Sequence, residues 1–171
     1  NYVVPKLNVV LAESSKIMRK ANVEIHYLDA CFPFVDGFPL IPHLSHDDGK
    51  KIDVSFVYLT PEKQVANNEK SVSGYGVYVE PKSGEVNHAE QCKKKGFWQY
   101  GISKYISFGE INDDLHFSEK HTKSLITSFT YQNSVNKLFI EPNLKQRLVV
   151  NHPKVRFHGC HAVRHDDHIH I

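Results

Sequence analysis

The segment that most restricts the fold is KIDVSFVYL, residues 51–59, because hydrophobic and polar side chains alternate along it. Every second position from Ile52 to Tyr58 is hydrophobic, and the positions between them include Asp53 and Ser55. Side chains of an extended strand point alternately to its two faces, so this pattern predicts a strand with one face on a hydrophobic core. We expect Asp53 to point away from that main core.

Other segments predict both helices and strands, in an order that does not alternate regularly. Apolar spacing and capping residues predict helices over 9–21, capped by Asn8, over 119–132, capped by Ser118, and over 143–150 after Pro142. Further strands are expected over 23–32 and 135–141, and HIHI at 168–171 should be extended. Without regular βαβ alternation, we expect an α+β fold with a mainly antiparallel sheet.

Length and composition limit the class of protein. The chain has 171 residues, of which 40% are hydrophobic and 11% aromatic, enough for one core and too many for a disordered segment. No repeat or linker divides it, so we expect a single domain over residues 1–171. No apolar run approaches the roughly 20 residues of a transmembrane helix. The net charge of +2 predicts no nucleic-acid partner, and the sequence indicates no oligomeric state.

The cysteine content excludes one kind of metal site. Cys31, Cys92 and Cys160 are too few and too scattered for a disulfide-held scaffold. They form no CxxC motif, so a four-cysteine zinc site is excluded. One bridge with a free thiol, or no bridge, are both compatible with the sequence.

Histidine is the residue type that points to chemistry, with 12 copies, six of them between His152 and His170. Imidazole is the commonest metal ligand and titrates near neutral pH, so this enrichment suggests a metal or proton-transfer site. In the final stretch HDDHIHI, a spacing of two places His168 and His170 on one face of an extended segment, with Ile169 and Ile171 towards the core. A structural pair of histidines is the alternative.

A second candidate lies in PHLSHDDGKKID, residues 42–53, where His46 precedes Asp53 by seven residues. A turn at Gly49 can fold the chain so that both reach one ion, although a surface histidine beside an exposed aspartate gives the same spacing. With His170 the two stretches supply two nitrogens and a carboxylate, which leave a fourth position of a catalytic zinc for water. Non-haem iron enzymes share this ligand set, but their compact His-x-Asp pair is absent here, which favours zinc.

These motifs resemble the active-site motifs of the penicillin-insensitive murein endopeptidases. That family belongs, with D-Ala-D-Ala peptidases, lysostaphin and the amino-terminal domain of hedgehog proteins, to the LAS group of zinc peptidases. The shared pattern is His-x6-Asp early and His-x-His late, and His43 and His165, each three residues before a motif histidine, are typical of the murein endopeptidases. The stretch KLFIEPNLK, residues 137–145, is also similar to that family.

The resemblance implies a small antiparallel sheet flanked by helices, as in hedgehog and D-Ala-D-Ala peptidases. It also implies a zinc ion held by His46, Asp53 and His170. His168 would lie beside the bound water, as general base or as the group that stabilises the oxyanion. His43 and His165 would line the site.

The implied function is zinc-dependent hydrolysis of an amide bond in peptidoglycan peptides, foremost as a D-alanyl endopeptidase. Such a substrate implies a periplasmic or secreted protein. A D-Ala-D-Ala dipeptidase or carboxypeptidase, or a zinc-containing binding module without turnover, are the alternatives.

Several other residues near the motifs are secondary candidates. Four aspartates can accept the second ring N–H of a site histidine, or lie in solvated turns: Asp47, Asp48, Asp166 and Asp167. Arg156 and Arg164 can clamp a substrate carboxylate, or be surface charges. HGCH, residues 158–161, can form a second metal site or hold a small buried thiol. Trp98 and Tyr100 can line a substrate groove or belong to the core.

Overall fold

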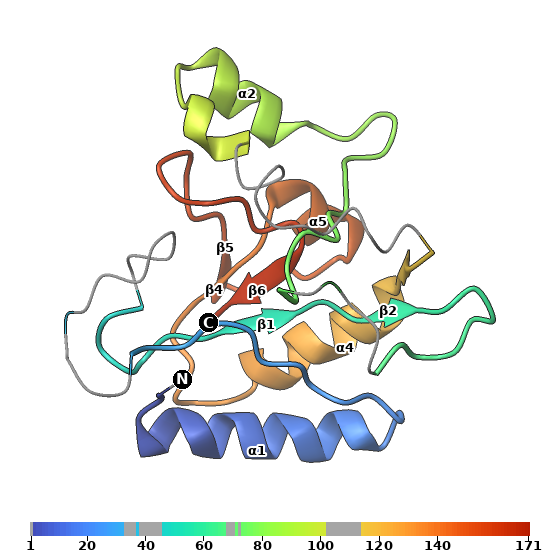
Figure 1. Cartoon of the computed structure of the whole chain (residues 1–171), viewed down its shortest axis with the longest axis vertical. Helices are drawn as coiled ribbons and strands as arrows, with labels where there is room; N and C mark the ends of the chain where they lie inside the picture. Colours follow the sequence, from blue (N-terminus) through green and yellow to red (C-terminus); the bar gives the residue numbers. More distant parts are fainter. Residues whose placement is uncertain (1, 33–36, 38–45, 68–70, 72, 102–113) are drawn as a thin grey trace.

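The computed structural model describes residues 2–32, 37, 46–67, 71, 73–101 and 114–171. These residues form an α+β fold, as predicted, in which helices surround a four-stranded sheet and a two-stranded sheet (Figure 1). The strands are β1 (Asp53–Ser55), β2 (Tyr58–Leu59), β3 (His116–Phe117), β4 (Leu138–Phe139), β5 (Val155–Arg156) and β6 (His168–His170). The helices are α1 (Pro5–Arg19), α2 (His88–Lys94), the 3₁₀ helix η1 (Trp98–Gly101), α4 (Glu119–Thr130) and α5 (Pro142–Arg147).

The larger sheet is mainly antiparallel. Its strand order is β1-β6-β4-β5, so β6 lies between β1 and β4 and pairs antiparallel with both. The pairing of β4 with β5 is parallel. Because β6 is central, the strand that carries the late histidine motif is covered by a neighbour on each edge.

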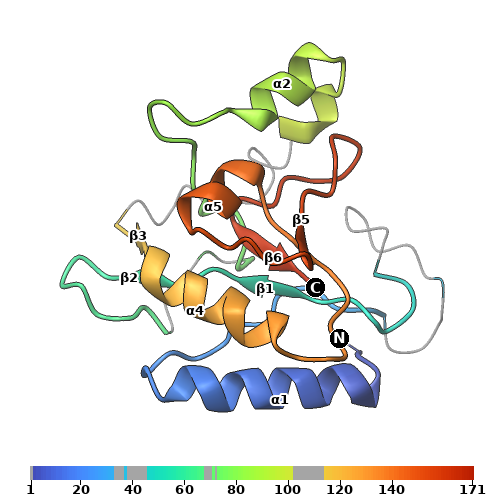
Figure 2. The same cartoon turned by 180° about the vertical axis from the view of Figure 1, so that it is seen from behind.

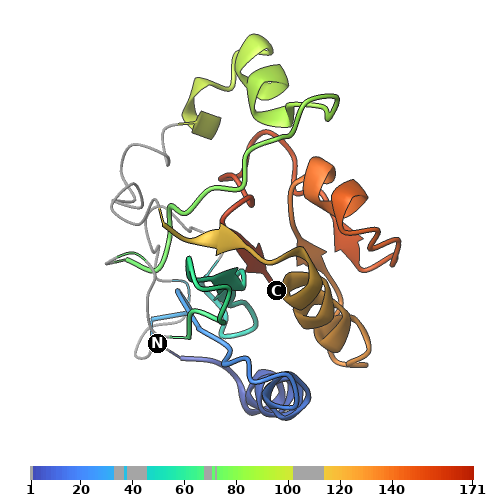
Figure 3. The ribbon, with the colours of Figure 1, turned by 90° about the vertical axis from the view of Figure 1, so that its right-hand side faces the viewer.

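Helices α1 and α4 pack together at one end of the molecule, and α2 lies at the other end (Figures 1 and 2). Figure 3 shows α1 nearly end-on with α4 beside it, and β3 leading into α4. In α4 the prediction was accurate: the Ser118 side chain accepts a hydrogen bond from the His121 backbone N–H, and Leu125 and Phe129 are buried. An accepting N-cap side chain satisfies an amide that lacks a partner within the helix.

The predicted start of the first helix was wrong. Helix α1 begins at Pro5 instead of residue 9, so Asn8 lies inside the helix and does not cap it. Proline suits the first helical position because its fixed φ fits the helix and its missing N–H has no partner there. The buried face includes Leu7 and Leu11, whereas Val9 is exposed.

The predicted strands are shorter in the structure. Residues 51–59 divide into β1 and β2, and residues 135–141 contribute only β4. The segment 23–32 forms no regular strand: it runs beside β1 with backbone hydrogen bonds to Asp53 and Ser55, and Tyr27 and Cys31 form isolated bridges, to Val54 and Tyr2. Since β1 is only three residues long, it offers no edge for a longer ladder.

The described part of the chain also bears on the cysteine pairing and on membrane-spanning helices. Cys92 and Cys160 form a disulfide, while Cys31 is buried and unbridged, which settles the pairing that the sequence left open. Among the described helices, none combines the length and hydrophobicity needed to span a bilayer.

Candidate metal centre

The pairing of β1 with β6 brings the two predicted motifs together. Asp53 lies opposite His170 and Ser55 opposite His168, while Ile169 falls on the other face. Residues directly opposite in an antiparallel pair share a face, so the carboxylate and both histidines project to the same side. The predicted common face of the two histidines is confirmed. Asp53 does lie on the face opposite its apolar neighbours, but it is completely buried.

The potential ligand atoms of His46, Asp53 and His170 lie within 4.8 Å of one another. His46 Nε2 is 3.2 Å from His170 Nδ1 and 3.3 Å from Asp53 Oδ1, and His170 Nδ1 is 2.8 Å from the same oxygen. Ligands about 2.0–2.1 Å from a tetrahedral ion are about 3.3 Å apart, so these spacings fit a metal site. The group can hold a metal ion, and nitrogen and carboxylate donors suit several divalent metals.

His168 lies on the far side of the same carboxylate. Its Nε2 is 3.7 Å from Asp53 Oδ2, and its Nδ1 is 2.5 Å from Asp167 Oδ1. Burial alone would lower the pKa of His168, but Asp167 and Asp53 outweigh it and raise the pKa to about 9. Among the described residues, Asp167 is the one of the four predicted aspartates that hydrogen-bonds to a site histidine.

His165 lines the site as a neutral imidazole. Burial, together with the nearby His168 and His170, holds its pKa well below the usual range. Its ring centroid is 5.0 Å from that of His168, and within the described chain its Nδ1 has no hydrogen-bond partner. The buried Glu141 fixes the backbone, because its carboxylate accepts from the His165 N–H at 3.1 Å. His43, the third predicted catalytic histidine, lies outside the described residues.

Sequence reasoning missed Tyr75 altogether. Its hydroxyl donates to Asp53 Oδ2 at 2.8 Å, and its ring lies edge-on to His168 with the centroids 5.1 Å apart. Burial, followed by the charges of Asp53 and Asp29, raises the pKa of Tyr75, so its proton is retained. No motif marks this residue, because it follows a polar stretch without periodicity that reads as a solvated loop.

Residues 158–161 form neither of the two alternatives, a second metal site or a small buried thiol. Cys160 is bonded to Cys92, and the His161 ring packs against Phe97. His158 instead stacks on Phe139, with ring centroids 4.2 Å apart. It is exposed and lies next to the candidate metal centre.

Arg164 holds a carboxylate of the protein itself, that of Asp166. Arg164 is buried and forms a bidentate pair with Asp166 and a 3.2 Å ion pair with Glu80. It is therefore neither a surface charge nor a ready substrate clamp. Arg156 is exposed, and its Nε donates to a backbone carbonyl, that of Pro153.

The remaining candidates separate into surface and core. Trp98 is 69% exposed, whereas Tyr100 is buried and donates its hydroxyl proton to Glu141. Asp47 and Asp48 pair with Lys51 in a partly exposed turn, which is the solvated alternative.

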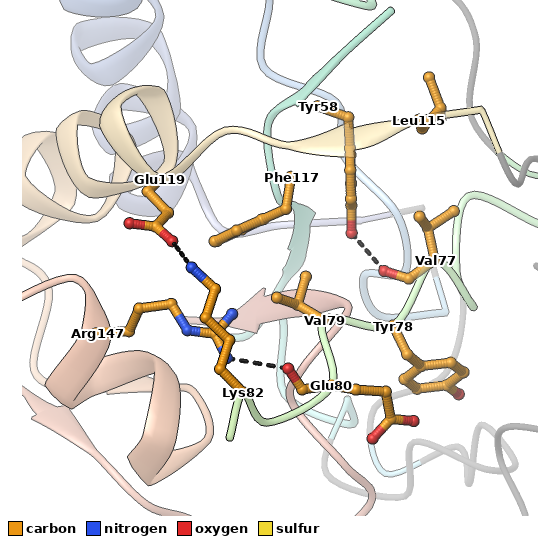
Figure 4. Close-up of a pocket in the computed structure, with 10 residues that line it drawn as sticks. All are labelled: Tyr58, Val77, Tyr78, Val79, Glu80, Lys82, Leu115, Phe117, Glu119 and Arg147. Carbon is orange, nitrogen blue, oxygen red and sulfur yellow. Dashed lines mark hydrogen bonds and ion pairs between the residues drawn. The ribbon is translucent and has the colours of Figure 1, made fainter. Parts of the chain in front are cut away.

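A separate cavity lies away from the candidate metal centre. Its volume is about 310 Å³, and none of the candidate ligands lines it. Figure 4 shows two interactions of its charged side chains: Lys82 pairs with Glu119 at 2.7 Å, and Arg147 donates to the Glu80 carbonyl. Tyr58 closes one side with a hydrogen bond to the Val77 carbonyl.

Comparison with known proteins identifies no family: the chain matches no protein-family model, and no curated protein matches it significantly. The resemblance to murein endopeptidases therefore rests on the sequence motifs alone.

Proposed function

We propose that the protein is a zinc-dependent hydrolase of amide bonds in peptidoglycan peptides, foremost a D-alanyl endopeptidase. The observation that carries this proposal is the meeting of His46, Asp53 and His170 in one buried group whose potential ligand atoms lie within 4.8 Å of one another. A zinc ion bound there would lower the pKa of a coordinated water from 15.7 to about 7 and polarise a substrate carbonyl. A peptidoglycan substrate requires a periplasmic or secreted location.

Each histidine has a distinct place in this proposal. His46 and His170 would hold the zinc with Asp53, while His168 would contact the reacting groups, oriented by Asp167 at 2.5 Å. His165 would line the site as a neutral ring, and His43 would complete it. The antiparallel β1–β6 pair, with the His-x-His motif on β6, supports a hedgehog or D-Ala-D-Ala peptidase type of fold.

The alternatives differ in what they must recognise. A dipeptidase or carboxypeptidase must bind a free carboxylate, yet Arg164 is committed to Asp166 and Arg156 to a backbone carbonyl. This favours an endopeptidase, which needs no free carboxylate. A binding module without turnover would retain the zinc and release no product.

The test uses the zinc-loaded protein and purified sacculi, with mass analysis of the released muropeptides. An endopeptidase converts cross-linked dimers into monomers, whereas a carboxypeptidase only removes terminal D-alanine. Replacement of His168 by alanine should lower the rate by about 10²–10⁴. The matched control is His116→Ala, which removes an exposed histidine on β3. Bound zinc without any product would favour the binding module.

A further inference from the structure

We infer that Tyr75 is a positioning residue that makes Asp53 a one-oxygen metal ligand. The inference rests on the proposed function, because it requires a metal ion at His46, Asp53 and His170. It adds a residue that no sequence motif indicates.

The direction of the Tyr75 hydroxyl is set by two neighbours. The Asp29 backbone N–H donates to the hydroxyl oxygen at 3.1 Å, and that oxygen lies 2.8 Å from Asp53 Oδ2. An N–H can only donate and an ionised carboxylate can only accept, so the hydroxyl accepts a hydrogen bond from Asp29 and donates one to Asp53. Asp29 is itself fixed to β1, since its carbonyl accepts the Asp53 N–H at 2.8 Å.

The two carboxylate oxygens of Asp53 are thereby divided between different partners. Oδ1 faces the other ligands, 2.8 Å from His170 Nδ1 and 3.3 Å from His46 Nε2. Oδ2 accepts a hydrogen bond from the Tyr75 hydroxyl and lies 3.7 Å from His168 Nε2. The Tyr75 hydrogen bond would compete with a metal ion for the lone pairs of Oδ2, so we expect the hydroxyl to favour coordination through Oδ1 alone.

The backbone around Tyr75 is adapted to this placement. Both neighbours, Gly74 and Gly76, have a positive backbone φ, of 78° and 91°. Residues other than glycine rarely adopt such values. The Gly76 N–H donates to Asp167 Oδ2 at 2.8 Å, and Asp167 in turn holds His168. One tripeptide therefore braces both carboxylates that contact the site histidines. Outer partners of this kind orient the ligands and tune the metal.

The test compares wild type, Tyr75→Phe and Tyr78→Phe for zinc affinity, measured by competition with a chromophoric chelator. Tyr78 is the control because it lies on the same segment but places its ring against Arg164, 4.9 Å from the guanidinium carbon. We expect Tyr75→Phe to weaken zinc binding about 10- to 100-fold, as loss of an outer-shell partner typically does. Tyr78→Phe should bind like the wild type.

Cobalt supplies a signature that simple destabilisation does not produce. The visible bands of Co²⁺ are intense in four-coordinate sites and weaken when further ligands enter. The Co²⁺ bands should therefore lose intensity in Tyr75→Phe as Asp53 Oδ2 becomes a ligand. If this variant does not fold, a crystal structure of the zinc-loaded wild type still tests the inference, because it should show a single carboxylate oxygen of Asp53 bound to the zinc.

The outcomes separate this inference from the proposed function. Equal zinc affinity and equal cobalt spectra in wild type and Tyr75→Phe would overturn the role of Tyr75, as would two carboxylate oxygens on zinc in the wild type. A wild type that binds neither metal would overturn the proposed function, and the inference with it.

Discussion

Two buried groups of ionisable side chains lie next to each other near residues 164–170, and they are built on different principles. In the first, Arg164 forms a bidentate pair with Asp166 and contacts Glu80. In the second, Asp53 is surrounded by titratable imidazoles, including those of His46 and His170. The first group contains its own permanent cation, and the second contains none.

This difference separates a structural ion pair from a candidate ligand group. Burying a charge is costly unless it is paired, and a guanidinium fork satisfies both oxygens of a carboxylate. Burial would lower the pKa of Arg164, but the charges of Asp166 and Glu80 outweigh this effect and raise the pKa above its usual value. Arg164 therefore remains a cation. The pKa of Asp53 would rise on burial, but His168, His170 and His46 hold it well below its usual range. The anionic carboxylate and the imidazole nitrogens together suit a divalent cation.

The largest effect should come from breaking the internally paired group. Replacement of Arg164 by methionine leaves Asp166 buried without its cation, and we expect the free energy of unfolding to fall by about 3–5 kcal/mol. Urea denaturation of the apoprotein measures this change. The double variant Arg164→Met/Asp166→Leu should recover most of the loss. A single variant as stable as the wild type would remove the contrast between the two groups.

The second effect concerns the candidate ligand group. Zinc that binds only the folded state should raise the free energy of unfolding by about 2.7 kcal/mol at a free concentration 100 times its Kd. Thermal melts with zinc, and with EDTA added afterwards, follow the gain and its reversal. The same gain in Asp53→Asn would mean that the ion binds elsewhere.

A third and smaller effect comes from a partly buried pair far from the candidate metal centre. Arg147 lowers the pKa of Glu85 to about 2, from an ordinary 4.5. Because the folded pKa is depressed, the stabilisation is present above about pH 4.5 and is lost as the pH falls towards 2.

We expect Glu85→Gln to lower the free energy of unfolding by about 1–2 kcal/mol at neutral pH, and by much less at pH 3. Urea denaturation at the two pH values measures both, in the presence of EDTA. Glu119→Gln, in the more exposed pair with Lys82, is the control and should have a smaller effect. A loss that is equal at both pH values would contradict the assigned cause.

The sequence was informative where a local period decides the structure. The spacing of His168 and His170 places both side chains on one face of any extended chain. The alternation in residues 51–59 places Asp53 on the face opposite its apolar neighbours. Their antiparallel register, Asp53 opposite His170, was not predictable from spacing, because it depends on contacts 117 residues apart. The hypothesis that these residues share one site came from their combined ligand chemistry and from the family resemblance.

The parts that the sequence did not predict depend on long-range partners. Tyr75 gains its role from hydrogen bonds to Asp53 and Asp29, neither of which a local pattern can indicate. Arg164 looked like a surface or substrate-binding charge, because its burial and its contact with Glu80, 84 residues away, depend on the tertiary fold. The boundary of α1 at Pro5 had a local signal, the preference of proline for the first helical turn, that the apolar spacing outweighed.

The most direct test of the metal centre is isothermal titration of metal-free protein with zinc, supported by elemental analysis. The wild type should bind one zinc per chain at this centre, and Asp53→Asn and His170→Ala should weaken that binding by more than about 100-fold, the upper end for outer-shell changes. Asp48→Asn, in a partly exposed turn, should bind like the wild type. A wild type without zinc, or ligand variants that bind it as tightly, would contradict the account.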